Sequence, residues 1–392
     1  MKNIKFICGP AGCSKTTQVI NLISDKTDFV CLAFTHSAVN NMIEKFLEIK
    51  AVDKKFIKDK FKTLHTFFRI PIDKDGSYKI IYHKIKFPKI VIIDEFSLID
   101  LNILSLIFDY AKRNKDSVFV LSGDVCQLNP ITKNFSNEFK FENYDIKNID
   151  VNLKEAELIL KHLQNNIFIM PQYQNSDKLI LTKNYRSNDS VMKFIDSILF
   201  CNDETAFYKI IEDNKYVEDN DVIFIGSKYK YLNKIYKLYG GNMLGRDIKT
   251  RMGNVKINDI DEYVLTKNLT CDFVNGDIIK FKFDGDDILI YRDEVEMKLE
   301  MIDGVYPILP KKFITAHKSQ GKSFDKICVI LDEMFDISML YTILTRARTK
   351  IYFTYDNIEN IKNLYFYTKC FVKMLDVVYS ISSTLIGLDS TG

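Results

Sequence analysis

Residues 9–17 read GPAGCSKTT and lie between a short apolar run and a stretch with helical spacing. The string follows the phosphate-loop pattern G-x-x-x-x-G-K-[ST], except that Ser14 stands where the pattern has glycine. In such a loop, backbone N–H groups surround the phosphates, the lysine reaches the β- and γ-phosphates, and the next hydroxyl binds Mg²⁺. The residues that we expect at the nucleotide are Gly9, Pro10, Ala11, Gly12, Cys13, Ser14, Lys15, Thr16 and Thr17.

The flanks of this loop fit the pattern. Residues 4–8 predict a buried strand and residues 16–24 predict a helix. If Ser14 must adopt a positive φ, the strain is about 1–3 kcal/mol, which a site fixed by its surroundings tolerates. A chance match to G-x-x-x-x-[GS]-K-[ST] occurs in roughly 3% of chains of this length. The loop alone therefore does not decide between a nucleotide site and a coincidence.

The composition is that of an ordinary soluble protein. The 392 residues suit two or three domains, with 46% hydrophobic and 27% charged residues. The net charge of +3 is weak evidence about partners, because a nucleic-acid binder would concentrate its basic residues locally. The eight cysteines include no CxxC pair, so we expect neither structural zinc nor a disulfide framework. Without an apolar run of membrane length or room for a signal peptide, we expect an intracellular protein without a membrane partner.

Helical and strand periods alternate from residue 4 to about residue 124, which predicts an α/β fold with a parallel sheet. A second alternating set begins at Lys178, so we expect one domain at 1–177 and another at 178–392. Two β insertions are predicted: a hairpin at about 69–87 that turns at 74–77, and an all-β stretch at about 255–312. Further expected strands are 29–34, 90–93, 117–122, 222–225, 327–331 and 351–354; the expected helices are 37–47, 155–163 and the start of the tail from 357, which ends loosely.

Two carboxylates follow the predicted strand at 90–93. Asp94 and Glu95 have the order expected where one carboxylate holds Mg²⁺ and the next polarises the attacking water. The alternative is a strand end with two solvated acids. Gln127 lies just beyond the strand at 117–122, where a polar amide would report whether the γ-phosphate is present. Its alternative is an ordinary loop residue.

Two arginines are candidates to stabilise charge on the departing phosphate. Arg186 lies in TKNYRSN (182–188) and Arg346 in TILTRAR (342–348). Arginine supplies a planar, always-charged group for this task, and we expect both to reach the nucleotide from the second α/β domain. Most single arginines are surface residues, so this assignment depends on their order and context.

Polar and aromatic strings suggest contact with a nucleic-acid strand. The string TAHKSQG (315–321) offers a hydroxyl, an imidazole and a lysine to a phosphodiester backbone. The string TLHTFF (63–68) places polar groups beside aromatic rings that would stack on single-stranded bases. The alternatives are a polar loop for the first string and core positions for the two phenylalanines.

Taken in order, these strings resemble the motifs of superfamily 1 helicases, over nearly the whole chain. GPAGCSKT resembles their Walker A element, IIDEFS (92–97) their Walker B and GDVCQLNP (123–130) their γ-phosphate sensor. AFTHSAVNNM (33–42) and TLHTFF are similar to their strand-contacting elements. The elements of the second motor domain are matched by NYRS (184–187), TAHKSQGKSFD (315–325) and ILTRAR (343–348). With this many motifs in order, we interpret Ser14 as a tolerated substitution in a working ATP site.

The resemblance implies two RecA-like P-loop motor domains and an ATP- and Mg²⁺-dependent helicase. DFVNGDIIKF (272–281) looks like part of the SH3-like insertion of the RecD and Dda type, and the hairpin at 69–87 takes the place of that branch's strand-splitting pin. That branch moves 5′ to 3′ on single-stranded DNA. The implied catalytic residues are Lys15, Glu95, Gln127, Arg186 and Arg346, with Thr16 and Asp94 at the metal and Gln320 and Gly321 at the nucleotide. The implied nucleic-acid contacts are Thr35, His36, Thr63, His65, Thr66, Phe67, Asn275, Thr315, His317 and Lys318.

Some features depart from that pattern. The family usually has an adenine-contacting segment ahead of Walker A, and this chain starts only one strand earlier, so the resemblance does not extend to base specificity for ATP. Asn129-Pro130 replaces Pro-Pro after the sensor. NYRS is closer to the branch of opposite polarity. Helicases of positive-strand RNA viruses are similarly compact and often carry a cysteine in the phosphate loop, so RNA stays an alternative to DNA and the expected source is a virus or phage. The rival functions are a strand-binding scaffold without hydrolysis and, remotely, a P-loop kinase. We expect a monomer, with replication proteins as candidate partners.

Overall fold

The computed structural model describes residues 3–73, 78–130, 151–219, 221–240, 245–270, 272–273, 275, 277–292, 294–332 and 336–382, without the side chains of 54 and 379–382. The chain divides into two compact units. Unit 1 comprises Met1–Ser187, Asp336–Thr345 and Phe366–Gly392, and unit 2 comprises Asn188–Phe335 and Arg346–Tyr365. Both units are thus assembled from segments that are distant in the chain.

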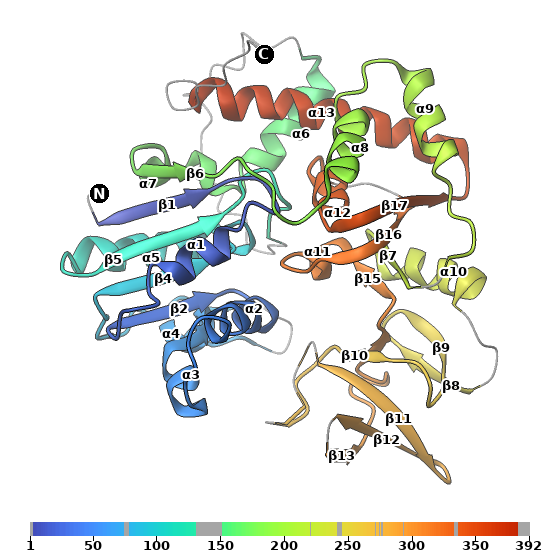
Figure 1. The fold of residues 1–392 in the computed structure, drawn as a ribbon, viewed down its shortest axis with the longest axis horizontal. Coiled ribbons are helices and arrows are strands. Elements are labelled where there is room, and N and C mark those ends of the chain that lie inside the picture. The colour runs from blue at the N-terminus through green and yellow to red at the C-terminus, as the bar shows by residue number, and fades with distance from the viewer. Residues whose placement is uncertain are drawn as a thin grey trace. The chain divides into compact units, whose positions relative to one another are not determined.

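Unit 1 is built on a parallel sheet of six strands in the order β3-β2-β4-β5-β1-β6 (Figure 1). The strands are β1 (Ile4–Cys8), β2 (Phe29–Ala33), β3 (Phe61–Thr63), β4 (Ile90–Asp94), β5 (Val118–Gly123) and β6 (Asp177–Ile180). The central strands are almost continuous apolar runs because helices cover both faces of such a sheet. Since all the strands are parallel, the carboxyl ends of β1, β4 and β5 meet at one edge.

Helices and short turns connect these strands. They are α1 (Lys15–Asn21), α2 (His36–Leu47), α3 (Lys54–Lys60), α4 (Leu64–Phe68), η1 (Phe96–Leu98), α5 (Leu101–Arg113), α6 (Leu153–Leu163), η3 (Ile167–Ile169) and α7 (Pro171–Gln174). The segment Asp336–Thr345 adds α12 (Met339–Leu344) to this unit. The long helix α13 (Ile358–Ser382) contributes its residues from Phe366 onward. On one face, Val19 and Ile20 of α1 and Phe46 of α2 pack with Phe29 of β2 in a buried apolar cluster.

Unit 2 contains a parallel sheet of four strands in the order β15-β7-β16-β17. Its strands are β7 (Val222–Gly226), β15 (Phe313–Thr315), β16 (Phe324–Leu331) and β17 (Ala347–Tyr355). Its helices are α8 (Asp189–Leu199), α9 (Glu204–Asp213), α10 (Tyr229–Tyr239) and the short α11 (Ala316–Ser319). The predicted strands at 222–225, 327–331 and 351–354 lie within these bounds.

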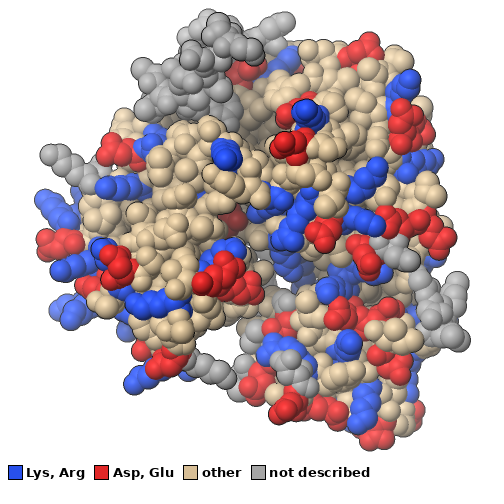
Figure 2. All heavy atoms as spheres, in the orientation of Figure 1, with Lys and Arg blue, Asp and Glu red and all other residues tan. Residues whose placement is uncertain are grey.

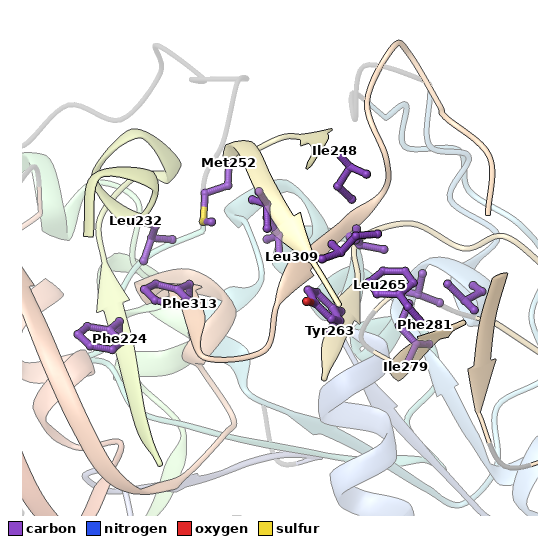
Figure 3. Packing of buried hydrophobic residues seen from close by; sticks show 14 of the residues in the cluster. Phe224, Leu232, Ile248, Met252, Tyr263, Leu265, Ile279, Phe281, Leu309 and Phe313 are labelled. Carbon is purple, nitrogen blue, oxygen red and sulfur yellow. The ribbon is translucent and has the colours of Figure 1, made fainter. Parts of the chain in front are cut away.

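Antiparallel strands are inserted into unit 2 between α10 and β15. Five strands form a sheet in the order β13-β12-β11-β10-β14, and two more form a separate pair. They are β8 (Arg246–Thr250), β9 (Gly253–Ile257), β10 (Tyr263–Leu265), β11 (Ile278–Asp284), β12 (Asp287–Arg292), β13 (Val295–Lys298) and β14 (Ile308–Pro310). One buried cluster runs from Phe224 and Phe313 of the parallel sheet, past Met252, to Tyr263 and Phe281 of the insertion (Figure 3). The insertion therefore shares its core with the unit that carries it.

The predicted fold class is confirmed at the level of an α/β protein with two parallel sheets and antiparallel additions. One assignment needs correction: β6, placed in the second domain by the predicted boundary at 178, pairs with β1 in the first sheet. It is an edge strand whose residues alternate between exposed and partly buried, and its one neighbour in the sheet is β1. Among the described residues of 69–87, pairing is limited to a bridge between Ile72 and Tyr78, and the predicted turn at 74–77 lies outside the described residues. The domain bounds 1–177 and 178–392 stay predictions.

Candidate nucleotide and nucleic-acid sites

The phosphate loop connects β1 to α1, as the sequence predicts. Ser14 has φ 57° and ψ 31°, in the left-handed region, and its side chain makes no capping hydrogen bond to α1. Ser14 thus has the positive φ for which the sequence predicts backbone strain. Gly12 has φ 87°, and a Cβ there would lie 2.7 Å from the Asn184 side chain. Glycine is required at position 12 both by its conformation and by this close neighbour.

Lys15 turns back over the loop. Its Nζ donates hydrogen bonds to the carbonyl oxygens of Gly9 (2.8 Å) and Pro10 (2.9 Å), and the residue is 8% exposed. Both partners of the Nζ group are carbonyl oxygens of the loop itself, so the ammonium lies where a bound anion would meet it. Burial raises the pKa of the neighbouring Cys13 thiol, so this cysteine is a neutral, apolar wall of the loop at neutral pH.

Asp94 lies at the end of β4, next to the phosphate loop. Thr16 Oγ1 donates a hydrogen bond to Asp94 Oδ2 (2.8 Å), and Ser122 Oγ of the adjacent strand donates to Asp94 Oδ1. Burial, and then the negative charge of Glu95, raise the pKa of Asp94 to about 6. A hydroxyl and a carboxylate in contact are hard oxygen ligands of the kind that Mg²⁺ takes.

Glu95 is held in an unusual conformation beside Asp94. Its φ is 55°, in the left-handed region, where a non-glycine residue is strained. Its Oε2 is buried and has no hydrogen-bond partner among the described residues. A buried carboxylate oxygen without a partner is costly unless something binds it. Together with the Thr16–Asp94 contact, this vacant acceptor fits a hydrated Mg²⁺ at the phosphate loop.

Gln127 follows β5 at the same edge and is buried. Its Nε2 donates a long hydrogen bond (3.4 Å) to Asp124 Oδ2, while its Oε1 has no partner among the described residues. Burial raises the pKa of Asp124. Asp124 and Ser122 were not among the predicted site residues, although Asp124 stands in GDVCQLNP (123–130) with Gln127 and Ser122 directly precedes that string.

The two candidate arginines lie in different units. Arg186 belongs to unit 1, not to the second domain as expected, because its segment follows β6. There Asn184 Nδ2 donates to Ala11 O (3.1 Å) and Tyr185 N–H donates to Gly12 O (2.9 Å), so the segment lies against the phosphate loop. Arg346 belongs to unit 2; it is 1% exposed, and its Nη1 donates to Lys322 O (3.4 Å).

In unit 1, two of the threonines predicted to contact nucleic acid cap helices. Thr35 Oγ1 accepts the N–H of Ala38 at the start of α2, and Thr63 Oγ1 accepts the N–H of Thr66 at the start of α4. The Thr63 hydroxyl also shares a hydrogen bond with Thr66 Oγ1 (2.9 Å), in which either group can donate. The Thr35 hydroxyl accepts the N–H of Ala38 and can still donate its own proton. His36 and Thr66 are exposed, and Phe67 is partly buried.

Phe68, next to Phe67, is fully buried. Of the two interpretations given for Phe68, base stacking or a core position, the core position is therefore confirmed. His65 lies beside the Phe34 ring, with 5.1 Å between ring centroids. Burial lowers the pKa of His65, so at neutral pH the imidazole is neutral.

In unit 2, Thr315 at the end of β15 caps α11 through the N–H of Lys318 (3.4 Å), and His317 lies between them on that helix. Burial, and then the charges of Lys322 and Arg251, lower the pKa of Lys318 to about 8. No ion pair is found for Lys318 among the described residues. A cation in that position is a candidate to meet an anion.

The remaining predicted residues of unit 2 are Gln320, Gly321 and Asn275. Gln320 is buried directly after α11, and Gly321 has φ 74°. Asn275 is exposed in the β insertion, where its N–H donates to Asn268 Oδ1 (2.8 Å).

Charge elsewhere is mixed. Basic and acidic side chains are interspersed over the face shown in Figure 2, in keeping with a net charge of +3. Across the described ranges, the longest and most apolar helices still fall short of what a membrane span needs. The same ranges contain no cluster of three or more His, Cys, Asp or Glu side chains arranged to hold a metal ion.

Comparisons with known proteins agree with this geometry. Residues 1–133 match a family model described as an AAA domain. The RecBCD enzyme subunit RecD of Buchnera aphidicola subsp. Schizaphis graminum (strain Sg) is 24% identical over 440 residues, which cover 90% of this chain and 70% of that protein. These similarities confirm the predicted resemblance to superfamily 1 helicases of the RecD type.

Solved structures of Pif1 helicases have the same fold. A structure of two coordinating Pif1 helicases on forked double-stranded DNA matches with a TM-score of 0.64 and 20% identity, over 98% of this chain and 94% of that one. The Bacteroides Pif1 helicase in complex with ADP-AlF3 and single-stranded DNA matches with a TM-score of 0.60 and 20% identity, over 92% and 90%. At this identity the likeness shows a shared fold.

Proposed function

We propose that this chain, which resembles the RecD and Pif1 branch of superfamily 1 helicases over nearly its whole length, is an ATP-driven helicase that moves on single-stranded DNA and separates duplexes. In this proposal its two parallel sheets are RecA-like motor domains, and the antiparallel sheet is the SH3-like insertion of the branch. The observation that carries the proposal is the contact between Thr16 and Asp94, which joins the phosphate loop to the carboxylates after β4.

The nucleotide half of the proposal assigns roles to residues of unit 1. Gly9 to Thr17 hold the phosphates, Lys15 turns its ammonium from the loop carbonyls to the terminal phosphates, and Arg186 adds charge beside Gly12. Thr16 and Asp94 would hold Mg²⁺, which neutralises phosphate charge when bound. Glu95 accepts a hydrogen bond from the attacking water and orients it, and Gln127 responds to the terminal phosphate.

From unit 2, the family resemblance adds Arg346, Gln320 and Gly321 to the residues that act on the nucleotide. Differential binding of ATP over ADP would then drive the motor, because only a ligand that prefers one state shifts an equilibrium.

The strand half of the proposal uses the capped helix starts. Thr35 lies two residues after β2, and Thr63 and Thr315 are the last residues of β3 and β15. In this proposal the hydroxyls of these three capping residues donate to phosphates. His36, His65, Thr66 and Phe67 are proposed to contact the strand in unit 1, and His317, Lys318 and Asn275 in unit 2. DNA is favoured over RNA because the solved Pif1 structures of the same fold contain DNA, and 5′ to 3′ movement is implied by the branch.

An unwinding experiment tests this proposal. Duplexes of DNA and of RNA, each with a 5′ or a 3′ single-stranded tail and a fluorescent label, are mixed with the protein and ATP·Mg²⁺. We expect release of the labelled strand from the 5′-tailed DNA, and no release with a non-hydrolysable ATP analogue. Release from the 3′-tailed DNA would contradict the proposed 5′ to 3′ polarity. Release from the RNA duplexes would contradict the proposed preference for DNA. No release from any duplex, without hydrolysis, would contradict the proposed function and favour a scaffold.

A further inference from the structure

A buried tyrosine hydroxyl in unit 1 links the phosphate loop to the loop after β5, which belong to two different sequence motifs. Tyr341 on α12 accepts a hydrogen bond from the N–H of Ala11 in the phosphate loop (3.3 Å) and donates one to Asp124 Oδ2 after β5 (2.8 Å). Tyr341 is 8% exposed and Asp124 is 3% exposed. Because a hydroxyl can donate once and still accept, both bonds are made at the same time.

The same short helix holds the loop that contains Gln127. Asp124 Oδ1 accepts the N–H of Cys126 (2.9 Å), which fixes the start of the loop. Thr342, the residue after Tyr341, accepts the N–H of Leu128 on its Oγ1 (3.1 Å). Two adjacent residues of α12 therefore bond to this loop on either side of Gln127.

Gln127 itself is bound less firmly than its surroundings. Its side-chain amide donates a long hydrogen bond to Asp124 Oδ2 (3.4 Å), and its buried Oε1 has no partner among the described residues. Unsatisfied buried oxygens are uncommon and costly, so a new ligand at Gln127 would be favoured. Asp124 and Tyr341 form the fixed part of this arrangement, and the Gln127 amide is the part that can be re-aimed.

We propose that Tyr341 is a positioning residue that couples the phosphate loop to Gln127 through Asp124. This inference rests on the proposed ATPase function. The Tyr341 ring stacks on Phe371, with 5.0 Å between ring centroids, so the ring is anchored and the hydroxyl carries the coupling. A displacement of Ala11 when phosphates bind changes the hydrogen bond to Tyr341, and through Asp124 it changes the aim of the Gln127 amide. Arg346 follows two residues after α12 in the chain, so the coupled helix leads directly into the candidate arginine of unit 2.

The direct test is Tyr341→Phe, which keeps the stacked ring and removes only the hydroxyl. We expect the kcat of strand-stimulated ATP hydrolysis to fall on the order of tenfold or more, while KM for ATP and the Kd for single-stranded DNA change less than about twofold. In a Gln127→Ala background, Tyr341→Phe should lower this kcat by less than a further factor of about two, because the two residues act as one unit. If the kcat loss of the double variant equals the product of the losses of the two single variants, the two residues are not coupled and the inference is wrong.

A matched control separates positioning from stability. Tyr110 is also buried in unit 1 and also bridges two backbone groups, since its hydroxyl accepts the N–H of His83 (2.9 Å) and donates to His83 O (2.8 Å). Tyr110→Phe should lower the melting temperature as much as Tyr341→Phe does and leave kcat near the wild-type value. Equal kcat losses in the two variants, or none in Tyr341→Phe, would contradict the inference. A wild-type chain without strand-stimulated hydrolysis would instead refute the proposed function on which it rests.

Discussion

The carboxyl edges of the two parallel sheets share a backbone device but carry different side chains. In unit 1, Thr63 is the last residue of β3 and caps α4, and in unit 2, Thr315 is the last residue of β15 and caps α11. Unit 1 adds a cation and an acid, Lys15 and Asp94, to its edge, whereas the edge of unit 2 presents Lys318 without an ion-pair partner among the described residues. The same architecture thus supplies an edge, and the residues at that edge decide its chemistry. A cation next to acids suits a nucleotide with its metal, and a cation without an ion-pair partner among the described residues suits a phosphodiester.

The largest effect is expected at Lys15, whose substitution tests whether the carboxyl edge of the unit 1 sheet binds the nucleotide. We expect Lys15→Ala to reduce strand-stimulated ATP hydrolysis by on the order of 100-fold or more, because the ammonium is lost where phosphate charge develops. Strand binding, measured by fluorescence anisotropy of labelled single-stranded DNA, should be largely retained. Retained hydrolysis would contradict the assignment of the unit 1 edge.

Lys318 tests the edge of unit 2 in the converse way. Lys318→Ala should weaken single-stranded DNA binding several-fold and reduce the slope of log K against log salt by about one, as expected for one lost phosphate contact. Hydrolysis at saturating DNA should change little. Lys326, which pairs with Asp219, is a matched control, since Lys326→Ala removes a lysine of the same unit that is already neutralised. Equal salt slopes in wild type and Lys318→Ala would rule out this contact.

The pH dependence of strand binding sharpens the same point. The pKa of Lys318 is lowered to about 8, so the side chain is charged below that pH and neutral above it. Since only the charged form attracts a phosphate, we expect affinity for single-stranded DNA to fall as the pH rises from 7 to 9. Lys318→Arg should remove this decline, because guanidinium stays charged throughout. A decline of the same size in the arginine variant would assign it to another group.

The smallest effect is expected at the serine that departs from the phosphate-loop pattern. Ser14 holds a left-handed conformation, which costs about 1–2 kcal/mol for a residue with a Cβ. Because its side chain makes no capping bond, Ser14→Gly should leave ATP hydrolysis unchanged or slightly faster in a steady-state assay. A large loss of hydrolysis would give the hydroxyl a role of its own.

Much of unit 1 could be predicted because its strands are continuous apolar runs. The strands expected at 4–8, 29–34, 90–93 and 117–122 agree with β1, β2, β4 and β5 to within one residue at each end. The phosphate loop and the Asp94-Glu95 pair follow two of these strands directly. Parallel pairing brings those strand ends together, so the heart of the candidate site follows from local pattern.

The remainder depends on pairings that local sequence does not encode. β6 is an edge strand of alternating exposure, and its partner β1 lies about 170 positions earlier in the chain. The hydrogen bond from Tyr341 to Asp124 joins residues 217 positions apart, in segments of different character. Tyr341 stands directly before TILTRAR, the string from which Arg346 was predicted. No local pattern marks this tyrosine, so its link to the phosphate loop could be found only from the structure.

The most direct measurement is the rate of ATP hydrolysis by the unmodified chain with and without single-stranded DNA, at fixed Mg²⁺. We expect hydrolysis to rise at least about tenfold when the strand is added, because the unit 1 edge supplies the chemistry and strand binding brings it to its active arrangement. A rate that is measurable but insensitive to the strand, or no hydrolysis in either condition, would contradict a motor in which these two sites act together.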